Sequence, residues 1–323
     1  MIVGGAGFIG SHFTDALLSD DRTSVVTLYD NFSSGRGGHY RDHEDDVRLS
    51  VVRADATDLA RLVDTMAGHD LIIHLASNPD IAAAMTDPAI DFDQGTVLTN
   101  NVVEAMRRTG VRRIAYASGS GVYGDLGELE ASEDHGPLVP VSTYGASKLA
   151  GEGLISAYAH MFEMQGFVFR FGNVVGRRQT HGVGFDFLNR LRDDPTQLSV
   201  LGDGSQSKSY ILASDVVTAV VTALDAGLVG PFQSFNVATG DYVTVREIVG
   251  LAIDVLGLDP AQVNVQYGPE PRGWKGDVPI VRLSTERVRA LGWRPSTGSG
   301  GALRASMQAM LEDLVVGADG GAQ

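Results

Sequence analysis

Tyr144 and Lys148, four residues apart, form the pair of side chains in this chain best suited to moving a proton. The run 142–165 is compatible with a helix, so this spacing places the phenol and the ammonium on one helix face. A free tyrosine, with a pKa of about 10, is a poor base at neutral pH. Because a nearby ammonium stabilises a phenolate, we predict that Lys148 lowers the pKa of Tyr144 and makes it a general base.

A second feature of the sequence is a glycine-rich turn at the N-terminus. A short apolar strand runs into Gly4, Gly7 and Gly10, and apolar residues at helical spacing follow. Such glycines permit a sharp strand-to-helix turn and let backbone amides approach a pyrophosphate at the helix N-terminus. Asp30 ends the next β-rich run, where a carboxylate would hold the adenosine ribose and repel a 2′-phosphate. The pattern predicts a site that prefers NAD, although the nearby Arg36 leaves NADP open.

Strand-like and helix-like segments alternate along the first half of the chain, as in a parallel sheet with right-handed crossovers. The expected strands are 2–3, 25–29, 47–54, 71–76, 112–117 and 167–171, and the expected helices include 8–18, a short one from 57, 88–109 and 142–165. We therefore predict an α/β fold, namely a Rossmann-type doubly wound parallel sheet with a smaller mixed α/β substrate-binding lobe. The first strand is short for its class, which predicts either a clipped strand or a start upstream of Met1.

The less regular second half indicates how two lobes divide the chain. We expect the NAD-binding domain to comprise residues 1–172 and about 206–239. The smaller lobe would comprise about 173–205 and 240–316. The Gly/Ala-rich residues 317–323 are predicted to form a disordered tail.

The composition of the 323 residues excludes several classes of function. A net charge of −15 argues against a nucleic-acid partner, and the absence of cysteine excludes disulfides and thiolate chemistry. No stretch reaches the roughly 18 apolar residues of a membrane span. The eight histidines show no metal-ligand spacing. We therefore expect a cytoplasmic protein with no metal and with no nucleic-acid or membrane partner.

With these motifs in order along nearly the whole chain, the sequence resembles the extended short-chain dehydrogenase/reductase family, in its NAD-dependent nucleotide-sugar epimerase/dehydratase branch. The matching segments are GGAGFIGSH at 4–12, YDN at 29–31, AD at 54–55, HLAS at 74–77, SGSGVYG at 118–124, YGASK at 144–148, RFGNV at 170–174, GDG at 202–204, SDV at 214–216 and RGWKGDVP at 272–279. The segment 176–187 is most similar to that of UDP-sugar 4-epimerases.

The resemblance implies NAD as the cofactor, a UDP-sugar as the substrate, and a homodimer that pairs through the helices at 88–109 and 142–165. The implied NAD-binding residues are Gly4, Gly7, Phe8, Ile9, Gly10, Asp30, Asn31, Ser33, Asp55, Ala56, Leu75, Ala76, Tyr144 and Lys148. The implied substrate-binding residues are Asn173, Lys208 and Arg272 at the diphosphate, Asp277 at the uridine ribose, and Arg178.

Arg178 bears on which sugar the resemblance implies. It is interpreted either as a surface cation or as a contact for the C6 carboxylate of a uronate. Both UDP-glucose/UDP-galactose and UDP-glucuronate/UDP-galacturonate therefore stay open. Thr180 and His181 are weaker candidates for the same pocket.

The implied reaction is epimerisation at C4, through oxidation to a 4-keto sugar, rotation of that sugar and re-reduction on the opposite face. Dehydratases of the family carry Asp-Glu in the loop at 118–121, and decarboxylases carry a Glu. This loop has no carboxylate here, which favours the isomerase. A dehydratase or reductase of a deoxysugar pathway, and an NAD-sensing regulator without catalysis, are the alternatives.

One position departs from the family pattern. The family places a Ser or Thr four residues before the tyrosine of VYG, where it shares a proton with the sugar 4-hydroxyl. Here Gly119 stands at that position. We predict that Ser120, or else Ser118, takes over the role as a catalytic residue; otherwise Tyr144 works unaided.

Four further residues have expected roles in packing or in shaping the pocket. His74 is expected to be a packed core histidine. Trp274 and Trp293 are expected to pack within the smaller lobe. Val281 stands where some relatives have a larger gating residue, so it leaves room for a rotating sugar.

Overall fold

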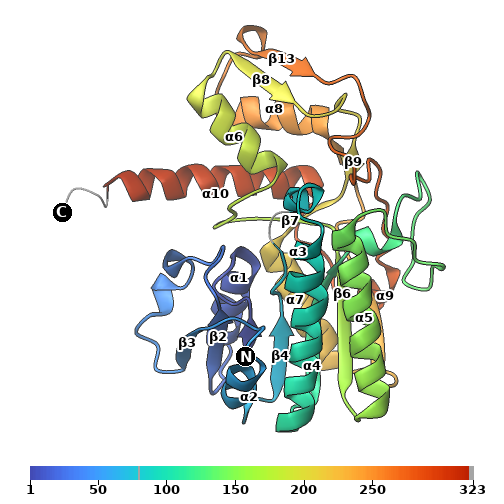
Figure 1. The fold of residues 1–323 in the computed structure, drawn as a ribbon. Coiled ribbons are helices and arrows are strands. Elements are labelled where there is room, and N and C mark those ends of the chain that lie inside the picture. The colour runs from blue at the N-terminus through green and yellow to red at the C-terminus, as the bar shows by residue number, and fades with distance from the viewer. Residues whose placement is uncertain (79–80, 320–323) are drawn as a thin grey trace.

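The computed structural model describes residues 1–78 and 81–319 (Figure 1). Its centre is a seven-stranded sheet whose neighbouring strands are all parallel. In spatial order the strands are β11 (Phe232–Val237), β6 (Gln165–Phe171), β5 (Arg113–Gly119), β4 (Leu71–His74), β1 (Ile2–Val3), β2 (Val26–Asp30) and β3 (Leu49–Arg53). The order reverses between β1 and β4, so the predicted doubly wound α/β sheet is confirmed.

Helices cover both faces of this sheet. α1 (Phe8–Leu18) and α7 (Ala213–Ala226) pack on one face, where Phe13 and Val216 join the apolar core. α2 (Leu59–Met66), α4 (Leu98–Thr109) and α5 (Thr143–Met161) cover the other face. Because both faces are buried, a central strand such as β2 has no polar-apolar alternation, and all five of its residues are buried.

The helix predicted over 88–109 is interrupted by a wider turn. α3 (Ala89–Asp91) passes into a π-helical segment, η4 (Phe92–Val97), which leads directly into α4. Such π-helical turns insert one extra residue and often mark functional sites. The periodicity therefore predicted a helix but not the change of winding inside it.

A second lobe lies beyond the carboxyl edge of the sheet (Figure 1). Its core is formed by α6 (Val183–Asp193), α8 (Val245–Val255) and the first part of α10 (Ser299–Asp319), with the parallel pair β8 (Gln197–Val200) and β13 (Asn264–Tyr267). Two further pairs stand between the lobes, β7 (Asn173–Val175) with β10 (Tyr210–Leu212) and β9 (Ser207–Lys208) with β12 (Val243–Thr244). The chain crosses between the lobes several times.

Short 3₁₀ segments complete the described chain. They are η1 (Gly37–His39), η2 (Arg41–His43), η3 (Ile81–Met85), η5 (Ser120–Tyr123) and η6 (Pro260–Gln262). The segments η1 and η2 lie in the loop between β2 and β3, and η5 follows β5 directly. The segment η5 therefore begins at the carboxyl edge of the sheet.

Two details differ from the predicted division of the chain. α9 (Glu286–Ala290) and Trp293 pack with the core of the sheet domain, although 240–316 was expected to belong to the smaller lobe. α10 continues through Asp319, so residues 317–319 are helical instead of disordered. The rest of the predicted tail, 320–323, lies outside the described residues.

Candidate active site

A cavity of about 700 Å³ opens between the two lobes at the carboxyl edge of the sheet. Gly4 after β1, Asp30 of β2, Leu75 after β4 and Gly119 of β5 all line it. The strand order reverses between β1 and β4, and open α/β sheets bind their ligands outside that point. From there the cavity continues to α6 and Trp274 in the second lobe.

The turn after β1 leaves room only for glycine. Gly4 has a φ of +83°, and a Cβ there would lie 2.7 Å from the backbone nitrogen of Ala76. A Cβ on Gly10 would lie 2.5 Å from the carbonyl oxygen of Gly5. Gly7 is the N-cap of α1 and supplies no side-chain cap, so the first helical amides remain available at the cavity wall. This positively polarised helix end fits a pyrophosphate.

Asp30 is a carboxylate fixed in orientation by the backbone. It is 8% exposed and accepts hydrogen bonds from the amides of Ala6 at 3.0 Å and Phe32 at 2.7 Å. A fixed carboxylate at the cavity wall suits ribose hydroxyls and disfavours a 2′-phosphate.

The predicted NAD-binding residues line this one cavity. They are Gly4, Gly7, Phe8, Ile9, Gly10, Asp30, Asn31, Ser33, Asp55, Ala56, Leu75, Ala76, Tyr144 and Lys148. The carboxylate of Asp55 is itself bound by the Asn31 amide at 2.8 Å and the Thr57 hydroxyl at 2.7 Å, which fixes this part of the wall. The glycine cradle, the helix end and the ribose carboxylate together fit a bound dinucleotide.

Tyr144 and Lys148 lie on the first turns of α5 beside the end of β5. The hydroxyl of Ser142 caps the helix by accepting from the amide of Gly145 at 3.1 Å. The ammonium of Lys148, a residue 3% exposed, donates to the carbonyl of Ala117 at 2.8 Å. It lies 5.5 Å from the centre of the Tyr144 ring, so the helical spacing does bring the two groups together.

The protein by itself does not acidify the phenol, contrary to the prediction. Burial raises the pKa of Tyr144 to about 12, opposed by a hydrogen bond with Ser77 and reinforced by the charge of Asp91. Burial also lowers the pKa of Lys148 to about 8, opposed by the charges of Asp91 and Glu152. Desolvation of the buried phenolate is thus the largest influence on the pKa of Tyr144.

The two serines beside Gly119 have different surroundings. Ser118 is buried and donates to the carboxylate of Glu152 at 2.5 Å. That carboxylate also receives two bonds from Arg170, at 3.0 and 2.7 Å. Ser120 is half-buried and lines the cavity at the start of η5. Since the Ser118 hydroxyl is committed to this buried ion pair, the geometry favours Ser120 and does not support Ser118.

Three of the predicted substrate-binding residues line the far end of the cavity. These are Asn173, Lys208 and Asp277, and the ammonium of Lys208 pairs with the Asp277 carboxylate at 2.6 Å. Arg272 is not a lining residue. It donates to the Asp277 carbonyl at 2.9 Å and pairs with Asp125 at 2.6 Å, so it supports the Asp277 segment from outside.

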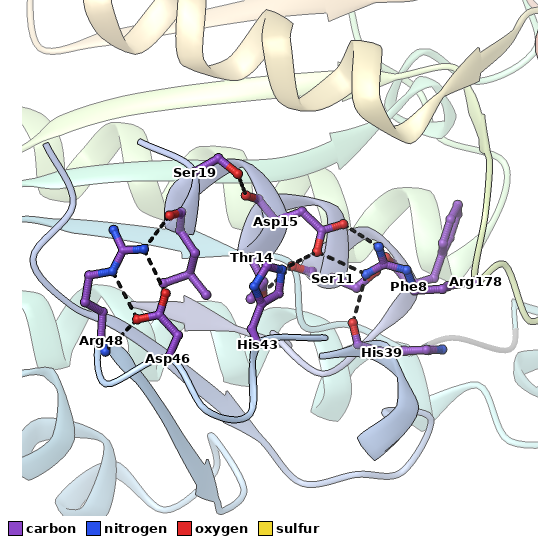
Figure 2. A network of polar contacts seen from close by, with 12 residues as sticks. Phe8, Ser11, Thr14, Asp15, Ser19, His39, His43, Asp46, Arg48 and Arg178 are labelled. Atoms are coloured by element: carbon purple, nitrogen blue, oxygen red, sulfur yellow. Dashed lines mark hydrogen bonds and ion pairs between the residues drawn. The ribbon is translucent and has the colours of Figure 1, made fainter. Parts of the chain in front are cut away.

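Arg178 points away from the cavity. Its guanidinium pairs with Asp15 of α1 and donates to the carbonyl of His39 at 2.9 Å (Figure 2). Asp15 also contacts the ring of His43 at 2.8 Å. The predicted contact between Arg178 and a sugar carboxylate is therefore wrong for this geometry, because the side chain is used to join the 176–182 loop to α1.

The tryptophans also differ from expectation. Trp274 lines the cavity instead of only packing within the second lobe. Trp293 packs against α7 in the sheet domain, where its indole donates to the carbonyl of Asp215 at 3.1 Å. The core assignment of His74 is confirmed, since the residue is fully buried and its ring contacts the Thr99 hydroxyl at 3.1 Å. Val281 lines the cavity, as its expected role requires.

Several polar residues that line the cavity were not predicted from the sequence. They are Gln94 of η4, Gln179, and Asp186 and Arg190 of α6. The available signal was the segment 176–187, which resembles known epimerases but does not reveal which side chains face inward. His181 lines the cavity and Thr180 does not.

Two kinds of feature are absent from the described residues. No group of three or more histidine, cysteine or acidic side chains there is arranged to hold a metal ion. No helix in the same part of the chain is long and apolar enough to cross a bilayer.

The sheet topology, the glycine cradle and the adjacent Tyr-Lys pair define a dinucleotide-dependent α/β enzyme fold. The chain belongs to the NAD dependent epimerase/dehydratase family, whose model matches residues 1–238. NAD is accordingly its cofactor.

The similar proteins include both epimerases and dehydratases. A UDP-glucose 4-epimerase of Mycolicibacterium smegmatis is 35% identical over 303 residues, which cover 91% of this chain and 93% of that protein. The crystal structure of a UDP-galactose 4-epimerase is 34% identical, with a TM-score of 0.85 and coverage of 97% and 98%. The dTDP-glucose 4,6-dehydratase DesIV of Streptomyces venezuelae, solved with NAD bound, is 26% identical, with a TM-score of 0.88 and coverage of 97% and 96%.

Proposed function

We propose that this protein is an NAD-dependent 4-epimerase of a UDP-sugar. The observation that carries the proposal is the position of Tyr144 and Lys148 in the same cavity as the dinucleotide cradle, with Ser120 beside them. The similarity to UDP-sugar 4-epimerases over more than nine-tenths of the chain supports the same conclusion.

Each residue of the site has a distinct role in the proposed reaction. Tyr144 takes the proton of the sugar 4-hydroxyl as C4 is oxidised, and it returns that proton when C4 is reduced from the other face. When bound, NAD would supply a reversible two-electron acceptor for C4, and its positive charge would lower the pKa of the phenol that burial raises. Ser120 hydrogen bonds to the same oxygen, while Lys208 and Asn173 hold the diphosphate about which the keto sugar rotates.

The end of β5 favours epimerisation over dehydration. Elimination needs a second proton carrier near C5 and C6, and the loop 118–121 contains no carboxylate. The nearby Glu152 is occupied by Arg170. A dehydratase remains the second candidate function because DesIV shares the fold.

We further propose a neutral hexose as the sugar. A uronate would need a cation for its C6 carboxylate. Arg178 is instead paired with Asp15 and hydrogen bonded to the carbonyl of His39. Of the lining cations, Lys148 bonds to Ala117, Lys208 pairs with Asp277, and Arg190 of α6 donates to the carbonyl of Ser199 at 3.0 Å. A UDP-glucose/UDP-galactose pair therefore fits better than a glucuronate/galacturonate pair.

The test is an NMR assay of purified protein with UDP-glucose, UDP-galactose or UDP-glucuronate and no added NAD. We expect UDP-glucose and UDP-galactose to equilibrate and UDP-glucuronate to stay unchanged. Tyr144→Phe is expected to abolish turnover while NAD remains bound. A 4-keto-6-deoxy product would contradict the proposal and favour the dehydratase.

The homodimer remains a proposal that comes from the resemblance, and the cytoplasmic location remains one that comes from the composition of the chain. Sedimentation of the purified protein is expected to give twice the chain mass of 34.2 kDa. A species at the mass of one chain would contradict the dimer.

A further inference from the structure

Asp91 is a buried carboxylate beside the Tyr-Lys pair that the proposed reaction does not use. It ends α3, is 1% exposed, and accepts hydrogen bonds from the Asn78 amide at 2.9 Å and the Thr143 hydroxyl at 2.7 Å. Both donors are neutral, so neither offsets the charge of the carboxylate. A buried charge without a compensating partner is costly, so its presence calls for an explanation.

The segment that carries Asp91 contacts α5 on both sides of Tyr144. Thr143, which binds Asp91, precedes the tyrosine directly. Ser147 lies one turn further on, and a Cβ on Gly95 of η4 would lie 2.7 Å from its hydroxyl oxygen. In Figure 1, α3 and the start of α4 run alongside α5. The π-helical turn thus holds Asp91 against the helix that carries the reacting groups.

Glu152 is the other carboxylate that acts on Lys148, but it has a partner. It lies one turn beyond Lys148 on α5 and forms a two-bond ion pair with Arg170, in which both side chains are 5% exposed. The guanidinium neutralises that carboxylate. The ion pairs among the described residues do not include Asp91, so its charge is available to Lys148.

The remaining titratable groups that face Lys148 carry no charge at neutral pH. Burial raises the pKa values of Tyr144 and of Tyr116, whose ring centre lies 5.2 Å from the ammonium. Burial, together with the charge of Lys148, lowers the pKa of His74 on β4 to about 3. Asp91 has the larger effect of the two carboxylates on Lys148 and lies outside the ion pairs of the described residues, so it is the group best placed to balance the ammonium.

We propose that Asp91 is a positioning residue whose carboxylate keeps the buried Lys148 protonated beside Tyr144 and NAD. This inference deepens the proposed function and rests on it for the role of Lys148. The chemistry requires the charged form, since only an ammonium stabilises the phenolate and donates to a ribose hydroxyl. Burial alone would favour the neutral amine.

The chain allows a direct test because it contains only three lysines, Lys148, Lys208 and Lys275. Protein labelled with ¹³C at the lysine ε carbon gives three NMR signals, which single Lys→Arg variants assign. In the unmodified protein we expect Lys148 to titrate at about 8. In Asp91→Asn we expect its midpoint to fall by about one pH unit, the usual size for loss of a nearby opposite charge.

Two matched variants separate charge from shape. Thr143→Val removes a hydrogen bond to Asp91 but keeps the charge, so the Lys148 midpoint should stay where it is. Asp91→Glu keeps the negative charge in altered geometry. The Lys148 midpoint in this variant should therefore lie close to that of the unmodified protein, even if thermal stability falls. If Asp91→Asn leaves the midpoint unchanged, or if Thr143→Val lowers it equally, the inference is overturned.

Activity gives a second readout. The alkaline limb of the kcat profile should begin at lower pH in Asp91→Asn, with about a fivefold loss at pH 8 for a one-unit change. An alkaline limb that does not move would count against the inference. If no UDP-sugar is turned over but the Lys148 midpoint shifts, the proposed reaction fails while the charge balance stands.

Discussion

At the scale of single residues, the end of β5 determines which hydroxyl could contact the proposed sugar substrate. Ser118 and Ser120 flank Gly119, but only Ser120 has its hydroxyl free of the Glu152–Arg170 pair. Gly119 has an extended φ of −156°, and a Cβ there would meet nothing within 4 Å. The position therefore tolerates a side chain that this chain does not carry.

Alanine substitutions at Ser118 and at Ser120 should change different properties of the protein. Ser120→Ala is expected to lower kcat by about 10- to 100-fold, the cost of losing a hydrogen bond to a developing charge. Ser118→Ala should leave kcat nearly unchanged but lower the free energy of unfolding by about 1–2 kcal/mol, because it leaves a buried carboxylate with one donor fewer. Steady-state kinetics and denaturant unfolding check both; the reverse pattern would assign the role to Ser118.

A serine at position 119 should rescue the Ser120→Ala variant. Gly119→Ser places a hydroxyl at the position the family uses, in open space and without backbone strain. We expect the double variant to recover about tenfold in kcat over Ser120→Ala. The matched control is Gly153→Ser on α5, where a Cβ also meets nothing within 4 Å. No recovery would mean that a hydroxyl at position 119 cannot replace the one at position 120.

At the scale of elements, the loop 176–182 joins the two lobes beside the cofactor site. Gln179 and His181 of this loop line the cavity, while Arg178, directly before Gln179, faces α1 (Figure 2). Arg178 has a φ of +65°, a conformation that costs a non-glycine residue free energy unless its contacts hold it there. The ion pair with Asp15 provides such contacts.

We expect Arg178→Gln to loosen this loop. It should lower the free energy of unfolding by about 1–3 kcal/mol and speed the loss of bound NAD, measured by nucleotide retention after gel filtration. Asp15→Asn should act similarly, and the double variant should cost less than the sum of the two. Arg177→Gln is the control, since that side chain is 57% exposed in its pair with Asp313 and should cost at most about 1 kcal/mol. Equal effects at 177 and 178 would contradict the role of the Asp15 contact.

The elements were the more predictable part of this protein. The parallel sheet and the dinucleotide cradle follow from local signals, because buried strands are apolar throughout and the turn at Gly4 requires glycine. The direction of a long side chain is not a local property. The sequence leaves Arg178 open between a surface cation and a contact for a sugar carboxylate, whereas its observed contact with Asp15 depends on how two distant segments pack.

At the scale of the whole molecule, stability in acid depends on groups that folding keeps neutral. His74 is buried between the sheet and α4, and desolvation lowers its pKa to about 3. In the unfolded chain a histidine titrates at about 6.5. The unfolded state therefore binds a proton first as the pH falls, and the stability present above pH 6.5 is lost progressively toward pH 3.

A variant at His74 should flatten this dependence. The free energy of unfolding should drop by about 1.4 kcal/mol per pH unit below 6.5 through this group. His74→Gln removes the titration, so the slope between pH 6 and 4 should decrease by about that amount in urea unfolding at each pH. His160→Gln, at an exposed position on α5, should leave the slope unchanged. If the free energy of unfolding falls with pH equally steeply in His74→Gln and in the unmodified protein, His74 is not a source of the acid sensitivity.

The phenol shows why charge was harder to predict than position. The spacing of Tyr144 and Lys148 correctly gave their proximity, but the balance between desolvation and attraction depends on how deeply both groups are buried. Burial of this kind arises from contacts between β4, β5, α3 and α5, which lie far apart in sequence. The buried carboxylate of Asp91 escaped the sequence analysis for the same reason.

The placement of β11 at the edge of the sheet has a consequence for biosynthesis. This strand pairs with β6, yet 60 or more residues of the other lobe and of α7 separate the two along the chain. When residue 171 has left the ribosome, the strand β6 at the margin of the sheet therefore still has unpaired backbone N–H and C=O groups. Nascent chains must wait for Val237 before that margin closes, which places the interval of greatest exposure to chaperones and aggregation in the middle of translation.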